Sequence, residues 1–283
     1  GPPKGGIVRH VPVHPELVSG LAAARERAVS VYRRPWLRPG YDLQPGDLIP
    51  LPPEALDGVE LLAAVQLRGS LALRAGDLSS ALERFVEALD LAEGMVGSSH
   101  PMVASCHRNL GAAYRLLGNF DAAVSSLTKS LQIYSACGES EGVGMAMTLC
   151  CLGNLDRARG EYGDAIRHYT HARDLIESPV GRGLHRAMAS VLHGLGAALV
   201  CVGRGREAIS VLARAQYIRA NTSSTIVQLA GTTLLYGEAL WLGHHHLAGY
   251  KKVQEAREIY RQHPHPDPER ELVFRRWLEE HEA

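Results

Sequence analysis

The sequence has no net charge, no long apolar run and no C-x-x-C pair, and each absence excludes a class of protein. Its 30 basic side chains are balanced by 30 acidic ones, whereas bulk nucleic-acid binding depends on many uncompensated Lys and Arg residues. No apolar stretch approaches about 18 residues, so no transmembrane helix is predicted. The N-terminus also lacks the apolar stretch of a signal peptide. We therefore expect neither membrane insertion nor nucleic acid as a partner.

The five cysteines are odd in number and lack the spacing of zinc ligands. Each lies in a run of Ala, Leu and Val, where a thiol behaves as a small buried hydrophobe. Reduced structural thiols favour a cytoplasmic location. The consecutive His244, His245 and His246 point in different directions around a helix, so no metal site is expected. No Ser/His/Asp or Cys/His set can be assembled either, and we expect no enzymatic activity and no cofactor.

A five-fold pattern of small residues organises the chain. Each unit has Gly, a second Gly seven residues later, Ala five residues further on, and then a large residue after four more. The units begin 41 to 43 residues apart, at Gly69, Gly111, Gly153, Gly196 and Gly237. In the fifth unit the first gap is six residues, which gives Gly237, Gly243, Ala248 and Lys252. Such periodicity is the signature of stacked repeats.

The pattern has a physical meaning, which residues 103–134 illustrate. Two amphipathic helices, at 103–117 and 120–134, flank Gly118, which occupies the left-handed position that ends the first helix. Gly111 and Ala123 are small where the paired helices cross. One such hairpin cannot bury its apolar faces alone, whereas a stack of hairpins can. The sequence therefore predicts an all-α protein, an α-solenoid of five helix hairpins.

These units resemble tetratricopeptide repeats. The family pattern of Leu-Gly, an aromatic residue, Gly, an aromatic residue and Ala appears as Leu110-Gly111, Tyr114, Gly118, Phe120 and Ala123. The period exceeds the usual 34 residues by about eight, which is similar to kinesin light chains and Pins-type scaffolds. Motifs of those two branches are echoed by Gly97-Ser98-Ser99-His100-Pro101 and by Leu152-Gly153-Asn154. The resemblance implies a right-handed solenoid whose first helices line a concave, partner-binding groove.

The chain is expected to have three parts. Residues 1–58 hold a helix at 13–34 and a Pro-rich extended arm at 35–53, which we expect to lie on the repeats. The five repeats fill residues 59–266, at about 59–97, 100–138, 141–180, 183–220 and 223–262. Residues 267–283 form a capping helix. The fourth and fifth repeats have Gly205 and His245 at an aromatic position, and we expect them to pack more loosely. Because the chain begins Gly1-Pro2, we expect an excised fragment of a longer protein.

By analogy to the family, groove positions of the first helices hold the candidate binding residues. These are Arg74, Arg108, Asn109, Arg115, Asn154, Arg157 and Trp241. Arginine offers a planar donor fork for carboxylates, and asparagine can hold a peptide backbone. The set favours a partner with an acidic linear motif and hydrophobic anchors. The alternative is that the arginines are solvated and paired with neighbours such as Glu83 or Asp156.

We predict a non-catalytic adaptor or scaffold that binds a linear segment of a partner protein in the groove. Two alternatives stay open. In one, residues 35–53 occupy the groove in cis and regulate it. In the other, the chain self-associates as a homodimer through Trp241 and the capping helix.

Overall fold

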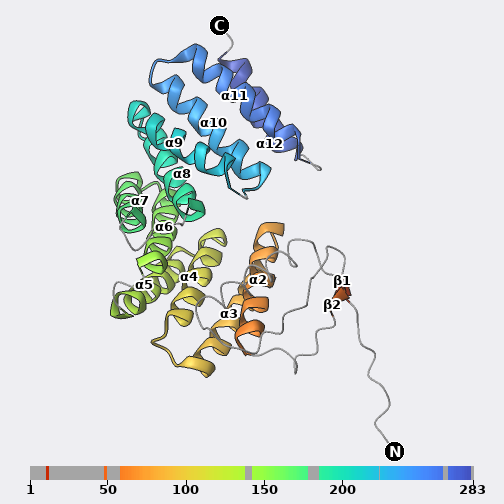
Figure 1. Cartoon of the computed structure of the whole chain (residues 1–283), viewed down its shortest axis with the longest axis vertical. Coiled ribbons are helices and arrows are strands. Elements are labelled where there is room, and N and C mark those ends of the chain that lie inside the picture. Colours follow the sequence, from red (N-terminus) through yellow and green to blue (C-terminus); the bar gives the residue numbers. More distant parts are fainter. Residues whose placement is uncertain are drawn as a thin grey trace, which may run out of the picture. The chain divides into compact units, whose positions relative to one another are not determined.

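The computed structural model of this 283-residue chain describes residues 11–12, 48–49, 58–137, 142–177, 185–222, 224–263 and 267–281. Helices make up nearly all of this part, which confirms the all-α class and the solenoid of helix hairpins (Figure 1). The chain divides into two compact units, residues 1–119 and 120–283. Within the described ranges, no helix is long and apolar enough to cross a bilayer.

Unit 1 (residues 1–119) holds two short strands and three helices. The helices are α2 (Gly58–Ala75), α3 (Leu78–Val96) and α4 (Pro101–Leu116). α2 and α3 form the first hairpin, and α4 packs against α3. Asp77 caps α3, because its carboxylate accepts a hydrogen bond from the backbone N–H of Ser80 at 3.1 Å.

The two strands were not predicted from the sequence. β1 (Val11–Pro12) and β2 (Leu48–Ile49) pair antiparallel, with Val11 opposite Ile49. The helix expected at 13–34 lies outside the described residues. The arm expected at 35–53 also lies outside them, apart from β2.

The junction between α3 and α4 explains the Gly-x-x-His-Pro motif. Gly97 has a φ of +76°, in the left-handed region that glycine adopts without strain. His100 then caps α4, since its Nδ1 accepts a hydrogen bond from the backbone N–H of Met102 at 3.2 Å. Pro101 follows in the first helical turn, where the N–H that proline lacks would have no partner.

Unit 2 (residues 120–283) consists of eight described helices. They are α5 (Phe120–Cys137), α6 (Gly142–Arg159), α7 (Tyr162–Glu177), α8 (His185–Cys201), α9 (Gly205–Ala220), α10 (Ile226–Leu242), α11 (His246–Arg261) and α12 (Pro268–Glu280). α6 with α7, α8 with α9 and α10 with α11 form hairpins, and each second helix packs on the next helix along the chain (Figure 1). α12 lies where the capping helix was expected.

A glycine of the first helix meets a large side chain of the second in each of these hairpins. A Cβ added at Gly153 would lie 2.9 Å from the ring of Tyr169, and one at Gly196 would lie 2.4 Å from Leu212. Both large side chains are fully buried. The same contact occurs in unit 1, between Gly69 and the ring of Phe85. Glycine is therefore needed where the paired helices come closest.

The turn of the fifth repeat corrects the pattern predicted for it. The left-handed residue is His244, with a φ of +68°, and not Gly243, whose φ is −81°. His244 follows Gly237 by seven residues, so the spacing is the same as in the other four repeats. Histidine at the turn hides this regularity from a search for glycine.

The helix crossing of the fifth repeat shifts by one residue in the same way. The small residue at the crossing is Gly249, whose added Cβ would lie 2.8 Å from the carbonyl oxygen of Gly237. Ala248 is exposed instead. The large residue that packs on Gly237 is Val253, which is fully buried, and not Lys252.

The looser packing expected for the fourth and fifth repeats is wrong. Gly205 is buried, and a Cβ there would lie 2.6 Å from Leu242 and 2.8 Å from the backbone nitrogen of Gly243. The missing side chain thus brings the start of α9 against the end of α10. In the fifth repeat, two glycines at the crossing bring the helix backbones together.

Two apolar cores fill unit 2. The larger extends over α6 to α9, and the smaller joins α10, α11 and α12 through Val253, Tyr260, Phe274 and Leu278. α12 therefore covers the apolar side of the last hairpin, as a terminal cap must in a repeat array.

Candidate functional site

The candidate residues lie on the first helices of the repeats. In unit 2, α6 packs beside α8 and α8 beside α10, and their outward sides are called the first-helix face here. Asn154 and Arg157 lie on α6, and Trp241 lies on α10. In unit 1 the candidates occupy two helices, with Arg74 in the last turn of α2 and Arg108, Asn109 and Arg115 on α4.

Polar groups join the two first helices of unit 1. Gln66 of α2 donates from Nε2 to Ser105 Oγ at 3.4 Å and to Cys106 Sγ at 3.1 Å, both on α4. Burial raises the pKa of the Cys106 thiol, which keeps the thiol protonated and unreactive at neutral pH. The positive charge of Arg108 acts on the same thiol in the opposite direction. This part of unit 1 is suited to binding rather than to chemistry.

Asn154 is held in place by a tyrosine beneath it. Its Oδ1 accepts a hydrogen bond from the phenol of Tyr169 at 2.8 Å. Burial raises the pKa of the Tyr169 phenol, so this donor keeps its proton, while nearby Arg157 shifts that pKa in the opposite direction. Arg157 itself is exposed. Asn154 and Arg157 thus lie close together on the first-helix face.

Arg157 is not neutralised by its neighbour in the sequence. Asp156 is buried and lies 2.6 Å from Nδ1 of His168 on α7, which is the opposite side of α6. No ion pair joins Arg157 to an acid in the described part of the chain. The alternative that Asp156 compensates Arg157 therefore does not hold.

A polar network that the sequence reasoning missed joins α8, α9 and α10. His193 Nδ1 lies 3.1 Å from Thr232 Oγ1 and 3.4 Å from Nη1 of Arg219. The same guanidinium nitrogen donates to the carbonyl oxygen of Gln228 at 2.6 Å and to the Thr232 hydroxyl. Because arginine only donates, Nδ1 of His193 accepts and its proton lies on Nε2.

The network buries a positive charge without a carboxylate. Arg219 is only 8 % exposed, and none of the described Asp or Glu side chains pairs with it. Burial lowers the pKa of Arg219 to about 10, so it stays charged at neutral pH. Burial, followed by the charges of Arg219 and Arg157, lowers the pKa of His193 to about 3, so that ring stays neutral. The charge beneath the first-helix face is therefore positive.

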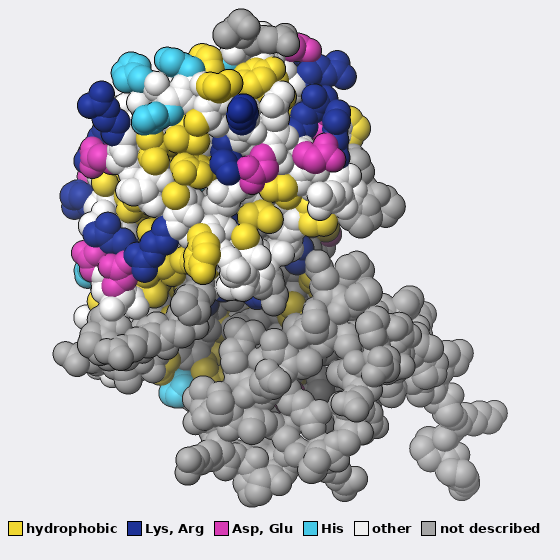
Figure 2. Space-filling model, turned by 45° about the horizontal axis from the view of Figure 1, so that its top comes forward, with side chains coloured by type: hydrophobic (Ala, Val, Ile, Leu, Met, Phe, Trp, Pro, Cys, Tyr) yellow, Lys and Arg dark blue, Asp and Glu magenta, His cyan; other side chains and the backbone are white. Residues whose placement is uncertain are grey.

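Trp241 contacts the capping helix of its own chain. Its ring lies edge-on to Trp277 and His281 of the C-terminal segment, at centroid distances of 5.6 and 4.6 Å, and edge-on to His246 at 4.4 Å. Figure 2, which brings the C-terminal helices forward, shows histidine side chains beside hydrophobic ones there. The surface that the sequence offered for self-association is thus already packed within one chain. Glu238, one turn before Trp241, has a pKa raised by burial, an effect that nearby His281 reduces.

The histidine run at 244–246 does not assemble a metal site. Its three residues are exposed at the turn between α10 and α11. Across the ranges that the structure describes, no group of three or more His, Cys, Asp or Glu side chains is placed to hold a metal ion.

Comparison with known proteins agrees with this geometry. The family model described as "Tetratricopeptide repeat" matches residues 61–136 and 144–219. Tetratricopeptide repeat protein 36 of Bos taurus and that of Homo sapiens are each 32 % identical over 124 residues, which is 44 % of this chain and 59 % of the relative. This chain therefore spans about three fifths of the length of the curated relatives that it matches.

Two solved structures are similar in fold. BtubC (BKLC) from P. vanneervenii superposes with a TM-score of 0.59 at 19 % identity, covering 89 % of this chain and 92 % of that one. A putative kinesin light chain of Podosopora anserina, with nearly identical TPR-like repeats, gives a TM-score of 0.52 at 17 % identity, covering 70 % and 94 %. Since the family model covers more than half of the sequence and the helices alternate as the repeat requires, the chain belongs to the tetratricopeptide-repeat family.

Proposed function

We propose that the chain is a non-catalytic adaptor that binds an acidic linear segment of a partner protein on its first helices. Tetratricopeptide-repeat proteins typically act as adaptors of this kind. In unit 2 the contacts would come from Asn154 and Arg157, with Trp241 at the end of the first-helix face. In unit 1 they would come from the four candidates on α2 and α4, namely Arg74, Arg108, Asn109 and Arg115.

The uncompensated positive charge of unit 2 is the observation that carries this proposal. Asp156 is the only acid in α6 and α8, and it is engaged by His168. Arg157 is exposed on α6, and Arg219 lies buried beneath the same face without a carboxylate. A buried cation is costly without a counter-charge. A carboxylate of a bound peptide would supply that charge and lower the cost.

Binding of an acidic segment is testable with a peptide array followed by fluorescence anisotropy. The full chain is applied to 12-residue peptides of random sequence in acidic, neutral and basic sets. We expect the bound peptides to be enriched in Asp and Glu. For the tightest of them, Arg157→Glu should raise Kd by about tenfold, since one charge-assisted contact is worth about 1.5 kcal/mol. Added salt should weaken binding as well.

Arg167 provides the matched control. It is an exposed arginine on α7 that already pairs with Asp164 at 2.5 Å, and it lies outside the first-helix face. Arg167→Glu makes the same charge change and should leave Kd within about twofold. Equal effects of the two substitutions, or an array without acidic enrichment, would show that the proposed face does not bind acidic peptides.

A further inference from the structure

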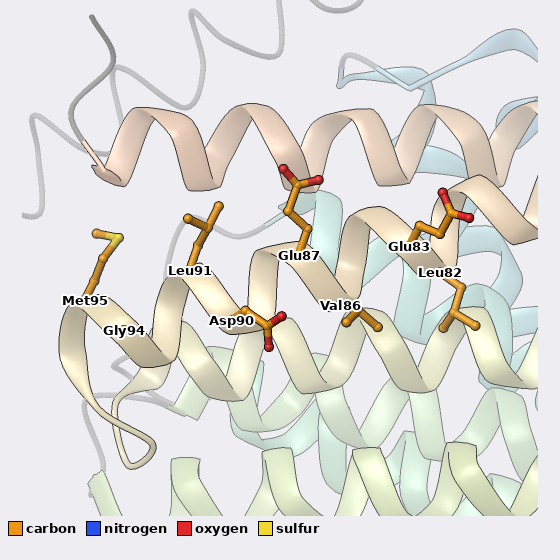
Figure 3. A pocket seen from close by; sticks show the side chains of 8 residues that line it. All are labelled: Leu82, Glu83, Val86, Glu87, Asp90, Leu91, Gly94 and Met95. Atoms are coloured by element: carbon orange, nitrogen blue, oxygen red, sulfur yellow. The ribbon is translucent and has the colours of Figure 1, made fainter. Parts of the chain in front are cut away.

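One side of α3 in unit 1 is apolar and exposed although helix α3 is otherwise packed on both neighbours. Val86 is 41 % exposed and Met95 39 % exposed. With Leu82 and Leu91 they line a hollow of about 810 Å³. Figure 3 shows the side chains in two rows along the helix, with Leu91 and Met95 on the side of α2 and Leu82 and Val86 on the other. We call this surface the α3 face.

Acidic side chains lie between these apolar ones. Glu83, Glu87 and Asp90 line the same hollow (Figure 3). Glu87 is paired with Arg84 at 2.6 Å, whereas Glu83 and Asp90 form no ion pair in the described part of unit 1. α3 as a whole carries four acids and one base. A segment that covers the α3 face should therefore be amphipathic and basic.

The chain itself supplies such a segment. Residues 13–34, which lie outside the described ranges, have apolar residues spaced alternately by four and three positions, at Leu17, Leu21, Ala24, Ala28 and Val31. This spacing places them on one side of a helix. The segment contains four arginines and two glutamates, so its charge is opposite to that of α3. As a helix it would be about 33 Å long, close to the roughly 28 Å of α3.

The described backbone brings the two ends of this argument together. Gly58, where α2 begins, lies against the α3 face, because a Cβ added there would be 2.9 Å from Sδ of Met95. Ile49 precedes Gly58 by nine residues, which span at most about 30 Å. Pairing of β1 with β2 fixes Val11 opposite Ile49. Residue 13 therefore starts within about one helix length of the α3 face.

We propose that residues 13–34 dock as an amphipathic helix on the α3 face and cap the first repeat. Arg25 and Arg27 then lie near Glu83 and Asp90, and the apolar stripe covers Val86. A short tether makes this docking intramolecular, with the high effective concentration that this provides. α12 covers the last hairpin in a comparable way.

Site-specific photocrosslinking in the full chain tests this docking. p-Benzoyl-phenylalanine replaces Val86, the chain is irradiated, and mass spectrometry identifies the crosslinked peptide. We expect a crosslink within one chain to a peptide from residues 13–34. The same probe at Val124, an exposed valine on α5 (37 % exposed), should give no crosslink to that segment. Far-ultraviolet circular dichroism checks that both labelled chains keep their helical content.

Charge reversal provides the second test. Arg25→Glu with Arg27→Glu should lower the Val86 crosslink at least fivefold, and adding Glu83→Arg with Asp90→Arg should restore it. Restoration separates a docking contact from simple unfolding, which further substitutions would not repair. Crosslinks to a second copy, crosslinks to another part of the chain, or none at all would overturn the proposal. So would a crosslink that is indifferent to both charge reversals.

Discussion

The buried neutral His193 predicts a specific loss of stability in mild acid. In the unfolded chain a histidine has a pKa near 6.5, whereas in the folded chain burial, Arg219 and Arg157 lower the pKa of His193 to about 3. Its stabilising contribution is present above pH 6.5 and is lost as the pH falls from 6.5 toward 3, because only the unfolded chain takes up the proton. At pH 5 this linkage amounts to about 2 kcal/mol. Water at the partly exposed ring reduces the expected loss to about 1–2 kcal/mol.

Urea unfolding at pH 7.5 and pH 5.0 measures this loss. Trp241 and Trp277 lie in the same unit as His193, so tryptophan fluorescence reports on that unit. His193→Gln keeps an acceptor for Arg219 but cannot titrate, and it should lose about 1–2 kcal/mol less than the wild type between the two pH values. His171→Gln, at an exposed position on α7, should lose as much as the wild type. The reasoning is refuted if His193→Gln shows the same pH dependence as the wild type.

Backbone and packing predictions follow from the glycines. Gly194→Ala places a Cβ 2.4 Å from the ring of Tyr169 and should destabilise unit 2 by about 1–3 kcal/mol in urea unfolding, whereas Gly163→Ala, with nothing within 4 Å, should be neutral or stabilise by up to about 1 kcal/mol. His244→Gly should raise the free energy of unfolding by about 1 kcal/mol, because it removes a side chain from a left-handed residue. Gly203→Ala, at a φ of +73°, should lower that free energy by a similar amount, and the opposite sign in either would contradict the assigned turn.

The helix hairpins could be predicted from the sequence because the glycine pattern records geometry. Gly118, Gly160 and Gly203 all have positive φ, and the glycines seven residues earlier lie at helix crossings. The pattern failed where another residue occupies the same conformation. Keeping the seven-residue spacing from Gly237, rather than searching for glycine, would have led to His244.

The binding surface was less predictable. Exposed arginines such as Arg157 are found by counting positions along a first helix, because their exposure follows from the repeat. Arg219 lies in the last turn of a second helix, where an arginine usually extends into solvent and favours the helix dipole. Its burial depends on Thr232 and Gln228 of the next repeat, and local sequence carries no signal for that contact.

The C-terminal end of the repeat array limits what the first-helix face can bind. Within the array, each second helix is covered by the first helix of the next repeat. After α11 that role passes to α12, whose Phe274 and Leu278 pack on Tyr260 and Val253. Trp277 extends this cover to Trp241, so Trp241 presents only part of its ring to a ligand. A peptide on unit 2 would therefore be fixed by charge at α6 and α8, and its hydrophobic residues would meet a surface that α12 helps to shape.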